Sequence, residues 1–126
     1  MGKSETIGEA YHITSDEVLT WDQICCTLAD AINVEPKIIH IPSDTIRYYD
    51  EEWADGLFGD KAFSMVFDNS KIKKIAPHFK AQISFVDSAK KIVDYYLADE
   101  TRRNINVELD AKMDRMISGF ESILNN

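Results

Sequence analysis

The pattern that most constrains the fold lies in residues 10–42, where two β-prone segments flank an amphipathic helix. Residues 10–13 and 37–42 have strand-forming composition, and Pro42 closes the second segment. A connection that contains a helix joins parallel strands through a right-handed crossover. The sequence therefore predicts a helix-rich α/β fold, whose small and mostly parallel sheet is built on this βαβ unit. Several further helices, one of them at the C-terminus, are expected to flank the sheet.

The helix of this unit has a defined start and a defined end. Thr20 stands three residues before Gln23, the spacing of a capping box in which each side chain accepts a hydrogen bond from the other residue's backbone N–H. Apolar side chains follow at helical spacing, at Trp21, Ile24, Cys25, Leu28 and Ile32. We expect a helix of about twelve residues that ends at Asn33 in the left-handed region.

Residues 59–77 form the second organising stretch. Gly59-Asp60 is typical of a turn, and the apolar residues 63–67 predict a short buried strand. The next three residues suit a helix start, because their side chains accept hydrogen bonds from free backbone N–H groups: Asp68, Asn69 and Ser70. A short basic helix should follow and end near Pro77. A loop that enters such a compact unit is a natural place for a ligand contact.

Three more amphipathic segments are expected. Residues 44–58 predict one helix or two short ones. Ser84 and Asp87 form a capping pair that opens another helix of three to four turns. Polar residues 99–106 interrupt the pattern, and residues 109–124 predict a final helix. That helix must cover either this domain or a partner surface.

The aromatic residues of the 44–58 segment have two interpretations. Trp53 and the Tyr48–Tyr49 pair could line a ligand pocket as an aromatic lid, or they could pack the segment onto its own domain. Regular apolar spacing favours packing. The carboxylates between these residues are expected to form a solvated helix face.

Charge and composition exclude several classes of partner. The formal net charge of −8 argues against duplex nucleic acid and against anionic membrane surfaces. The basic cluster of Lys71, Lys73 and Lys74 is expected to be a solvated helix face. Residues 1–6 contain no apolar run typical of a signal peptide and are expected to be a tag or linker remnant. Cys25 and Cys26 are adjacent and provide no disulfide framework, so a cytoplasmic location is expected.

The chain carries no recognisable catalytic or metal-binding motif of its own. No Gly-x-Gly-x-x-Gly occurs, so a dinucleotide turn cannot be built. The histidines lack helical ligand spacing to one another or to a carboxylate, which argues against zinc: His12, His40 and His78. We therefore expect no catalytic, cofactor-binding or metal-ligating residues in this chain.

Several short motifs, in their order and spacing, resemble the carboxy-terminal part of the NAD-dependent epimerase/dehydratase family, the extended short-chain dehydrogenases. The motifs are Gly8-Glu9-Ala10-Tyr11-His12-Ile13-Thr14, Leu19-Thr20-Trp21, Ile39-His40-Ile41-Pro42, Gly59-Asp60 and Asp68-Asn69-Ser70-Lys71. In that family this region is the smaller, substrate-binding domain, set beside a Rossmann domain that carries the cofactor and the chemistry. The resemblance implies a substrate-binding domain over residues 7–98 and a helical extension over 99–126 that packs on it or on a partner.

The resemblance also implies that this chain is incomplete as an enzyme. The family's catalytic Tyr-x-x-x-Lys is absent, because no tyrosine here is followed four residues later by lysine. A full-length parent would use NAD or NADP on a small-molecule substrate, a sugar or a nucleotide sugar. The missing Rossmann domain would leave apolar surface exposed, through which the chain could self-associate.

Position by position, the resemblance points to substrate-side residues at Asp60 and Lys61, with His40 and Ser43 behind them. Asp60 could equally serve only to stabilise its turn. Nucleotide-sugar members commonly place an arginine before the Gly-Asp turn, where this chain has Leu57-Phe58. Lysine does not replace the planar donor fork of arginine. A different sugar or a carbonyl compound therefore remains open as the substrate.

An alternative from another class is a freestanding, non-enzymatic interaction module. The final amphipathic helix carries Met113, Met116 and Phe120 on one face. Flexible, methionine-rich surfaces suit adaptable recognition of a partner protein.

Overall fold

The computed structural model describes residues 4–124, and all of its regular secondary structure is helical. The α-helices are α1 (Trp21–Ala31), α2 (Ser43–Ile46), α3 (Glu51–Gly56), α4 (Ser70–Ile75), α5 (Phe85–Leu97) and α6 (Val107–Leu124). Two 3₁₀ helices, η1 (Ser4–Thr6) and η3 (Glu100–Arg102), and one π-helical turn, η2 (Leu57–Lys61), complete the set. Of the stretch 1–6 that we expect to be a linker remnant, residues 1–3 lie outside the described residues.

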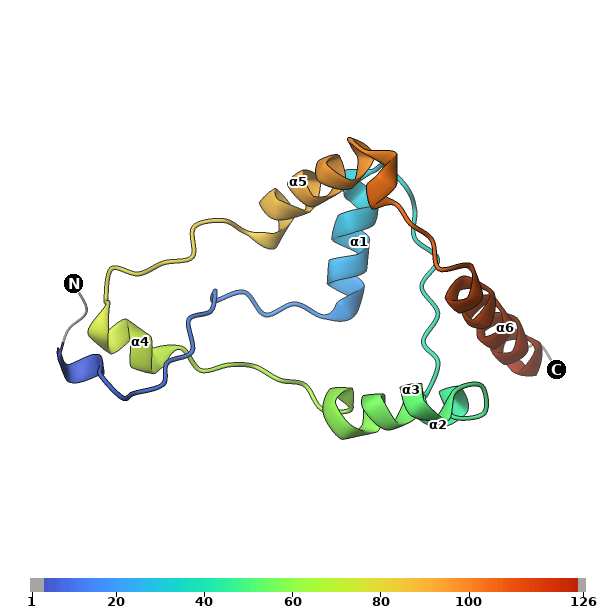
Figure 1. Cartoon of the computed structure of the whole chain (residues 1–126), viewed down its shortest axis with the longest axis horizontal. Helices are drawn as coiled ribbons and strands as arrows, with labels where there is room; N and C mark the ends of the chain where they lie inside the picture. Colours follow the sequence, from blue (N-terminus) through green and yellow to red (C-terminus); the bar gives the residue numbers. More distant parts are fainter. Residues whose placement is uncertain (1–3, 125–126) are drawn as a thin grey trace.

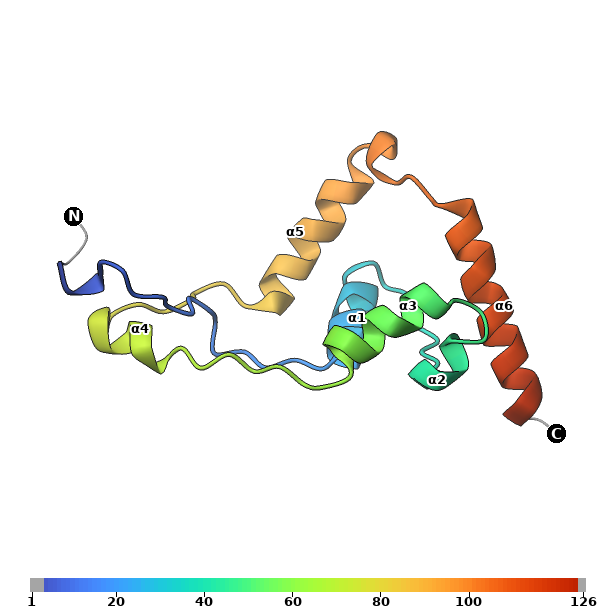
Figure 2. The same cartoon turned by 60° about the horizontal axis from the view of Figure 1, so that its bottom comes forward.

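The arrangement is open and elongated, and long irregular connections separate most of the helices (Figure 1). α4 and the N-terminal segment lie together at one end of the molecule, and α6 lies at the other. α5 crosses α1 between these ends, and α2 and α3 follow one another below (Figures 1 and 2).

The predicted α/β fold is wrong, because residues 4–124 contain no strand. Residues 10–13, 37–42 and 63–67, each predicted to be a strand, all lie in irregular backbone. A β-prone segment becomes a strand only where a neighbour supplies a ladder of backbone hydrogen bonds. Here residues 10–13 and 63–67 approach each other through side chains, with the His12 and Phe67 rings 5.0 Å apart, and no ladder joins them. Without paired strands there is no βαβ unit.

Two further predictions for residues 59–77 are also wrong. The expected Gly59-Asp60 turn lies inside η2, which continues directly from α3 because Gly56 and Leu57 keep helical backbone angles. The apolar segment after it is not buried: Phe63 is 81% exposed and Phe67 is 53% exposed. No second layer of the described residues covers this segment, so its apolar side chains stay exposed.

The helix boundaries follow the predicted local signals closely. Thr20 and Gln23 form the complete capping box of α1, with backbone-to-side-chain distances of 2.8 and 3.2 Å. Asn33 has φ 56°, the left-handed conformation expected after this helix. The Ser84 hydroxyl accepts a hydrogen bond from the Asp87 N–H and donates one to the Asp87 carboxylate. These contacts are local, so the sequence is enough to specify them.

The middle and final helices agree in part with expectation. The 44–58 segment forms two short helices, α2 and α3, but Ser43 is the first residue of α2 and Pro42 occupies the cap position. α4 stops at Ile75, and Ala76 turns to an extended conformation before Pro77, as expected. The final helix, α6, packs on its own chain, where Met116 is 3% exposed.

Small residues mark the points of closest helix contact. Ala29 of α1 and Ala89 of α5 are buried where these two helices cross, and Ala54 is buried in α3. At the other end, α6 is held by polar contacts as well as by Met116. Lys112 donates to the Asp50 carboxylate, and the Tyr49 hydroxyl lies so close to Gly119 that a Cβ added there would be 2.1 Å from it.

Most of the apolar surface remains uncovered. The chain exposes 10520 Å², whereas a compact monomer of its mass, 14.4 kDa, is expected to expose about 6,800 Å². The difference is on the order of 3,700 Å². Large apolar side chains contribute to it: Trp21 is 74% exposed, Tyr48 90% and Phe63 81%.

The crossing of α1 and α5 provides a test of this packing. Ala89→Leu should lower the free energy of unfolding by about 1–3 kcal/mol, because the larger side chain forces the helices apart. Urea denaturation followed by far-UV circular dichroism measures the change. Ala98→Leu is the matched control, since Ala98 is exposed at the end of α5. An equal loss in both variants would contradict the packing described.

Candidate functional site

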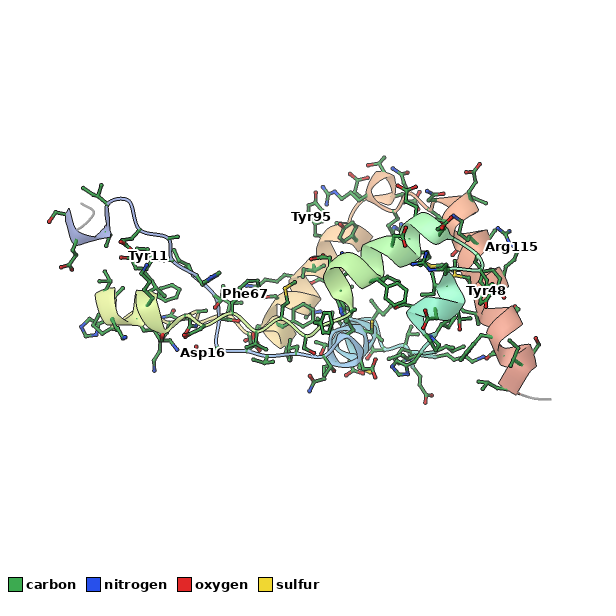
Figure 3. All side chains as sticks on the ribbon, turned by 90° about the horizontal axis from the view of Figure 1, so that it is seen from below. Tyr11, Asp16, Tyr48, Phe67, Tyr95 and Arg115 are labelled. Atoms are coloured by element: carbon green, nitrogen blue, oxygen red, sulfur yellow. The ribbon has the colours of Figure 1, made fainter. Side chains whose placement is uncertain are left out.

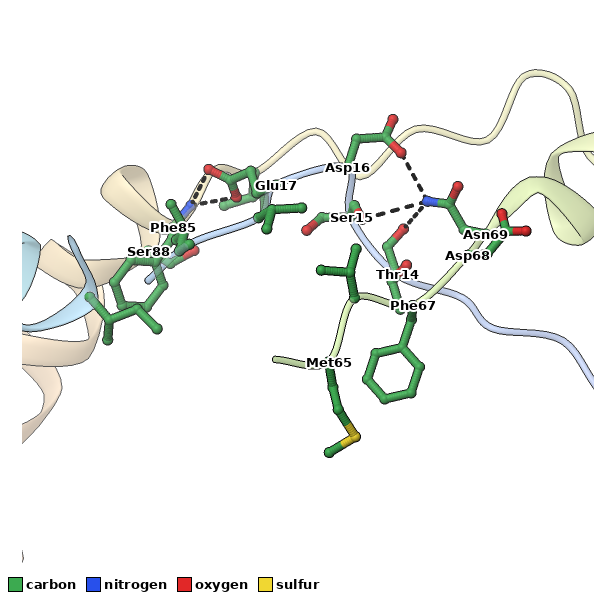
Figure 4. A pocket seen from close by; sticks show the side chains of 15 residues that line it. Thr14, Ser15, Asp16, Glu17, Met65, Phe67, Asp68, Asn69, Phe85 and Ser88 are labelled. Carbon is green, nitrogen blue, oxygen red and sulfur yellow. Dashed lines mark hydrogen bonds between the residues drawn. The ribbon is translucent and has the colours of Figure 1, made fainter. Parts of the chain in front are cut away.

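The largest hollow described lies where three chain segments meet, and we call it the trough. It has a volume of about 640 Å³ and is lined by residues of the segments 14–19, 65–69 and 83–88, together with Ile24 (Figure 4). Carboxylates, hydroxyls and one amide line part of its wall, and aliphatic and aromatic side chains line the rest. The trough is therefore an apolar hollow with a polar edge.

Asn69 ties two sides of the trough together. Its side-chain Nδ2 donates to the Thr14 carbonyl at 3.2 Å and to the Asp16 carboxylate at 2.9 Å, and it lies 3.5 Å from the Ser15 carbonyl (Figure 4). Asn69 is positioned by the turn that opens α4, in which the Ser70 N–H donates to Asp68 at 2.8 Å. A local helix-start motif thus places an amide where it bridges segments more than fifty residues apart in sequence.

The lysines of α4 reinforce this attachment. Lys73 donates to the Asp16 carboxylate, and Lys71 donates to Glu9 at 2.6 Å and to the Ala10 carbonyl at 3.1 Å. The Lys71 ammonium also lies 4.8 Å from the centre of the Tyr11 ring, a cation–π distance. Figure 3 shows Tyr11 between the N-terminal segment and α4. Lys71 and Lys73, which we expected on a solvated face, keep side chains that are 52% and 41% exposed and also hold the N-terminal segment.

Glu17 closes the third side of the trough at the start of α5. Its carboxylate accepts a hydrogen bond from the Phe85 N–H, with N–O distances of 2.9 and 3.3 Å (Figure 4). A carboxylate at a helix N-terminus also interacts favourably with the helix dipole. Residues 14–17 thereby contact both α4 and α5.

The electrostatics of the trough are negative. Its lining contains three carboxylates, Asp16, Glu17 and Asp68, and no lysine, arginine or histidine from the described residues. Hydrogen bonds from Asn69 and then Lys73 lower the pKa of Asp16. Hydrogen bonds from the Ser70 backbone and hydroxyl lower the pKa of Asp68. Both groups are therefore ionised at neutral pH.

One polar atom of the trough is left without a partner. Among residues 4–124, the Thr14 hydroxyl oxygen is buried and forms no hydrogen bond. A buried hydroxyl without a partner is unfavourable by about 1–3 kcal/mol. A bound group that offers this hydroxyl a donor or an acceptor would recover that cost.

The residues predicted to face substrate do not line the trough. Asp60 and Lys61 pair with each other at 2.8 Å on η2, and both side chains are more than half exposed. His40 contacts the Asp22 carboxylate at 2.9 and 3.1 Å, and its side chain is 76% exposed. Ser43 lies half-buried at the start of α2.

Lys61 does line a second, smaller hollow of about 370 Å³. Asp50, Glu52, Trp53, Gly56 and Leu57 form the rest of its wall. Trp53 also lines a hollow beside α6, together with Met116. The aromatic residue thus borders a ligand-sized hollow on one side and packs on its own chain on the other, whereas Tyr48 is 90% exposed.

Sequence reasoning missed the bridging role of Asn69 and did not single out Thr14. Asp68, Asn69 and Ser70 are all residue types that start helices, and capping by itself explains their presence. The polar run of residues 14–17 was a second indication of a site in the sequence. It follows a β-prone segment and does not stand at the start of a predicted helix, so capping does not explain it. Only the fold brings the two stretches together.

Side-chain oxygens cap the starts of α1 and α5. A dinucleotide's pyrophosphate binds free N–H groups at a helix N-terminus. Here the Phe85 N–H of α5 already donates to Glu17, and the Gln23 N–H of α1 donates to Thr20. Each of these helix starts is occupied by a side-chain oxygen.

The part of the chain that the structure describes contains neither a metal-binding cluster nor a membrane-spanning helix. Residues 4–124 hold no group of three or more His, Cys, Asp or Glu side chains suited to a metal ion. None of the helices in the same range has the length and apolar character needed to cross a membrane.

The Asn69 bridge can be tested through the ionisation of Asp16. In Asn69→Ala, the pKa of Asp16 should rise toward its ordinary value and remain somewhat low because Lys73 stays. Since folding lowers this pKa, the stabilisation is present above the ordinary value and lost as the pH falls through the lowered one. NMR titration of the Asp16 carboxyl carbon measures the shift. Asn104→Ala, which removes an amide bonded only to the Thr101 carbonyl, should leave Asp16 unchanged.

Compared with family models, with curated proteins and with solved structures, the chain has no match. The resemblance to epimerases and dehydratases therefore rests on the motifs of the sequence itself.

Proposed function

We propose that this chain is the substrate-recognition part of an NAD(P)-dependent sugar epimerase or dehydratase, or of a related reductase. In this proposal the cofactor and the hydride-transfer chemistry belong to a Rossmann domain that the described residues do not include. The chain would bind the substrate, orient it and exclude water from one side of it. A cytoplasmic location belongs to the same proposal and agrees with the free thiols of Cys25 and Cys26.

The observation that carries the proposal is the large exposed surface of the chain, which includes many large apolar side chains. The exposed area of 10520 Å² exceeds by roughly half the value of about 6,800 Å² expected for a compact monomer. A substrate-recognition part that folds against a cofactor domain would have this property when it is seen alone. The order of the sequence motifs points to a Rossmann domain as the partner that would cover this surface.

The hollow beside Lys61 supports the substrate side of the proposal. Trp53 offers a flat apolar face, and Lys61 offers a positive charge that suits a phosphate or a polar oxygen. Asp60 keeps the Lys61 ammonium in place through their 2.8 Å contact. His40 and Ser43 remain substrate-side candidates only in an assembly that brings them to the same surface.

The freestanding interaction module is less well supported. It needs the methionine face of α6 to be available, but Met116 is 3% exposed and shares a hollow with Ile39, Ile41 and Trp53. Lys112 and the close approach of Tyr49 to Gly119 hold the same helix against its own chain.

Four measurements on the purified chain test the proposal. Calorimetry with millimolar NAD should give no heat of binding, and incubation with UDP-glucose and NAD should give no product. X-ray scattering should give a radius of gyration clearly above the value of about 14 Å expected for a compact domain of this length. Adding a Rossmann domain taken from an extended short-chain dehydrogenase should reduce the binding of an apolar dye.

Each measurement has an outcome that would contradict the proposal. Micromolar binding of NAD, or turnover by the chain alone, would show that the chemistry is complete here. A compact, dye-free monomer would remove the need for a covering domain. A Lys61→Ala variant serves to separate substrate contact from docking, because it should leave the effect of the Rossmann domain on dye binding unchanged.

A further inference from the structure

The trough exposes apolar side chains on all three of its segments. Val18 is 65% exposed, Met65 62%, Val66 66% and Ile83 61%. Met65 and Phe67 point to the same side of their segment, as alternate residues of an extended chain do (Figure 4). Exposed apolar side chains gathered around one hollow mark a surface that gains free energy when it is covered.

The charge around this hollow limits what can cover it. Asp16, Glu17 and Asp68 line it, and Lys73 is bound to only one of them. Glu17 and Asp68 accept hydrogen bonds from backbone N–H groups, which are neutral. Lys74 also acts electrostatically on Asp68, and Lys80 on Asp16, so Glu17 keeps the least compensated charge of the three. A covering surface must therefore be apolar at its centre and basic at its edge.

A second copy of this chain does not meet that requirement. The chain carries a net charge of −8, so two copies repel each other, and most strongly where both present carboxylates. A basic polypeptide is attracted by the same field.

We propose that the trough between residues 14–19, 65–69 and 83–88 docks a segment of another polypeptide that presents apolar side chains flanked by lysine or arginine. The apolar side chains lie against Val18, Val66 and Ile83, and the basic residues face Glu17 and Asp68. This proposal does not depend on the enzymatic assignment, because it uses only the lining and the charge of the trough.

Two synthetic peptides test the proposal directly. They share the same leucine and phenylalanine positions, and one carries lysine where the other carries glutamate. Calorimetry at low salt should detect binding of the lysine peptide by the whole chain, and added salt should weaken it. The glutamate peptide should not bind. NMR should show the lysine peptide shifting amide signals of residues 14–19, 65–69 and 83–88.

Two valine variants locate the contact. Val66→Asp should weaken the lysine peptide by about tenfold, although it adds a negative charge, because an apolar contact is lost. Val107→Asp is the matched control: Val107 is 74% exposed at the start of α6 and lies outside the trough, so affinity should stay within about twofold. Val66 lies in irregular, exposed backbone, and circular dichroism should show unchanged helix content in both variants.

The results that would overturn the proposal are distinct from those that bear on the enzymatic assignment. Equal binding of both peptides, equal weakening by both valine variants, or amide shifts confined to α6 would each refute docking in the trough. Self-association of the chain that disappears in Val66→Asp would show that a second copy is the occupant. None of these outcomes alters the NAD or UDP-glucose measurements.

Discussion

Covering apolar surface is the constraint on which the rest of this structure depends. Each amphipathic helix must bury its apolar face, and here the partners within the chain are few. α1 meets α5, with Ala29 and Ala89 buried, and Met116 of α6 is buried and lines one hollow together with Ile46 and Trp53. Between these two contacts the chain runs as irregular, exposed connections. The α1–α5 contact lies between the ends of the molecule and the α6 contact lies at one end, and many apolar side chains outside these contacts stay exposed.

Side-chain hydrogen bonds and ion pairs, and no sheet, join the N-terminal segment to α4 and to the start of α5. Asn69 and Lys73 hold Asp16, Lys71 holds Glu9, and Glu17 binds the start of α5. Such exposed contacts fix which segments are neighbours, but each contributes little to stability. They bring residues 14–17, 68–69 and 83–88 together without burying the apolar residues between them. The trough is the result.

The trough and the Lys61 hollow differ in size and in lining, and we expect them to bind different kinds of partner. The Lys61 hollow is small, bears an aromatic wall and contains both charges, which suits a small polar molecule. The trough is larger, has aliphatic and aromatic side chains in its lining, and contains carboxylates but no lysine, arginine or histidine among the described residues, which suits a polypeptide. The two hollows therefore suit different classes of partner, a small polar molecule at Lys61 and a polypeptide at the trough.

The sequence by itself determined the local features of this protein. The Thr20–Gln23 box, the Ser84–Asp87 cap, the left-handed Asn33 and the end of α4 before Pro77 all depend on residues within four positions of one another. The tertiary structure alone decided whether residues 10–13, 37–42 and 63–67 become strands, and it left them unpaired. It also decided that Asn69 would bridge to Thr14 and Asp16, and that Asp60 and Lys61 would lie outside the trough. The physical reason is the separation along the chain of the residues that must interact. A cap is satisfied by residues of its own helix, whereas a strand or a binding site needs atoms from distant segments, and no local sequence pattern can place those.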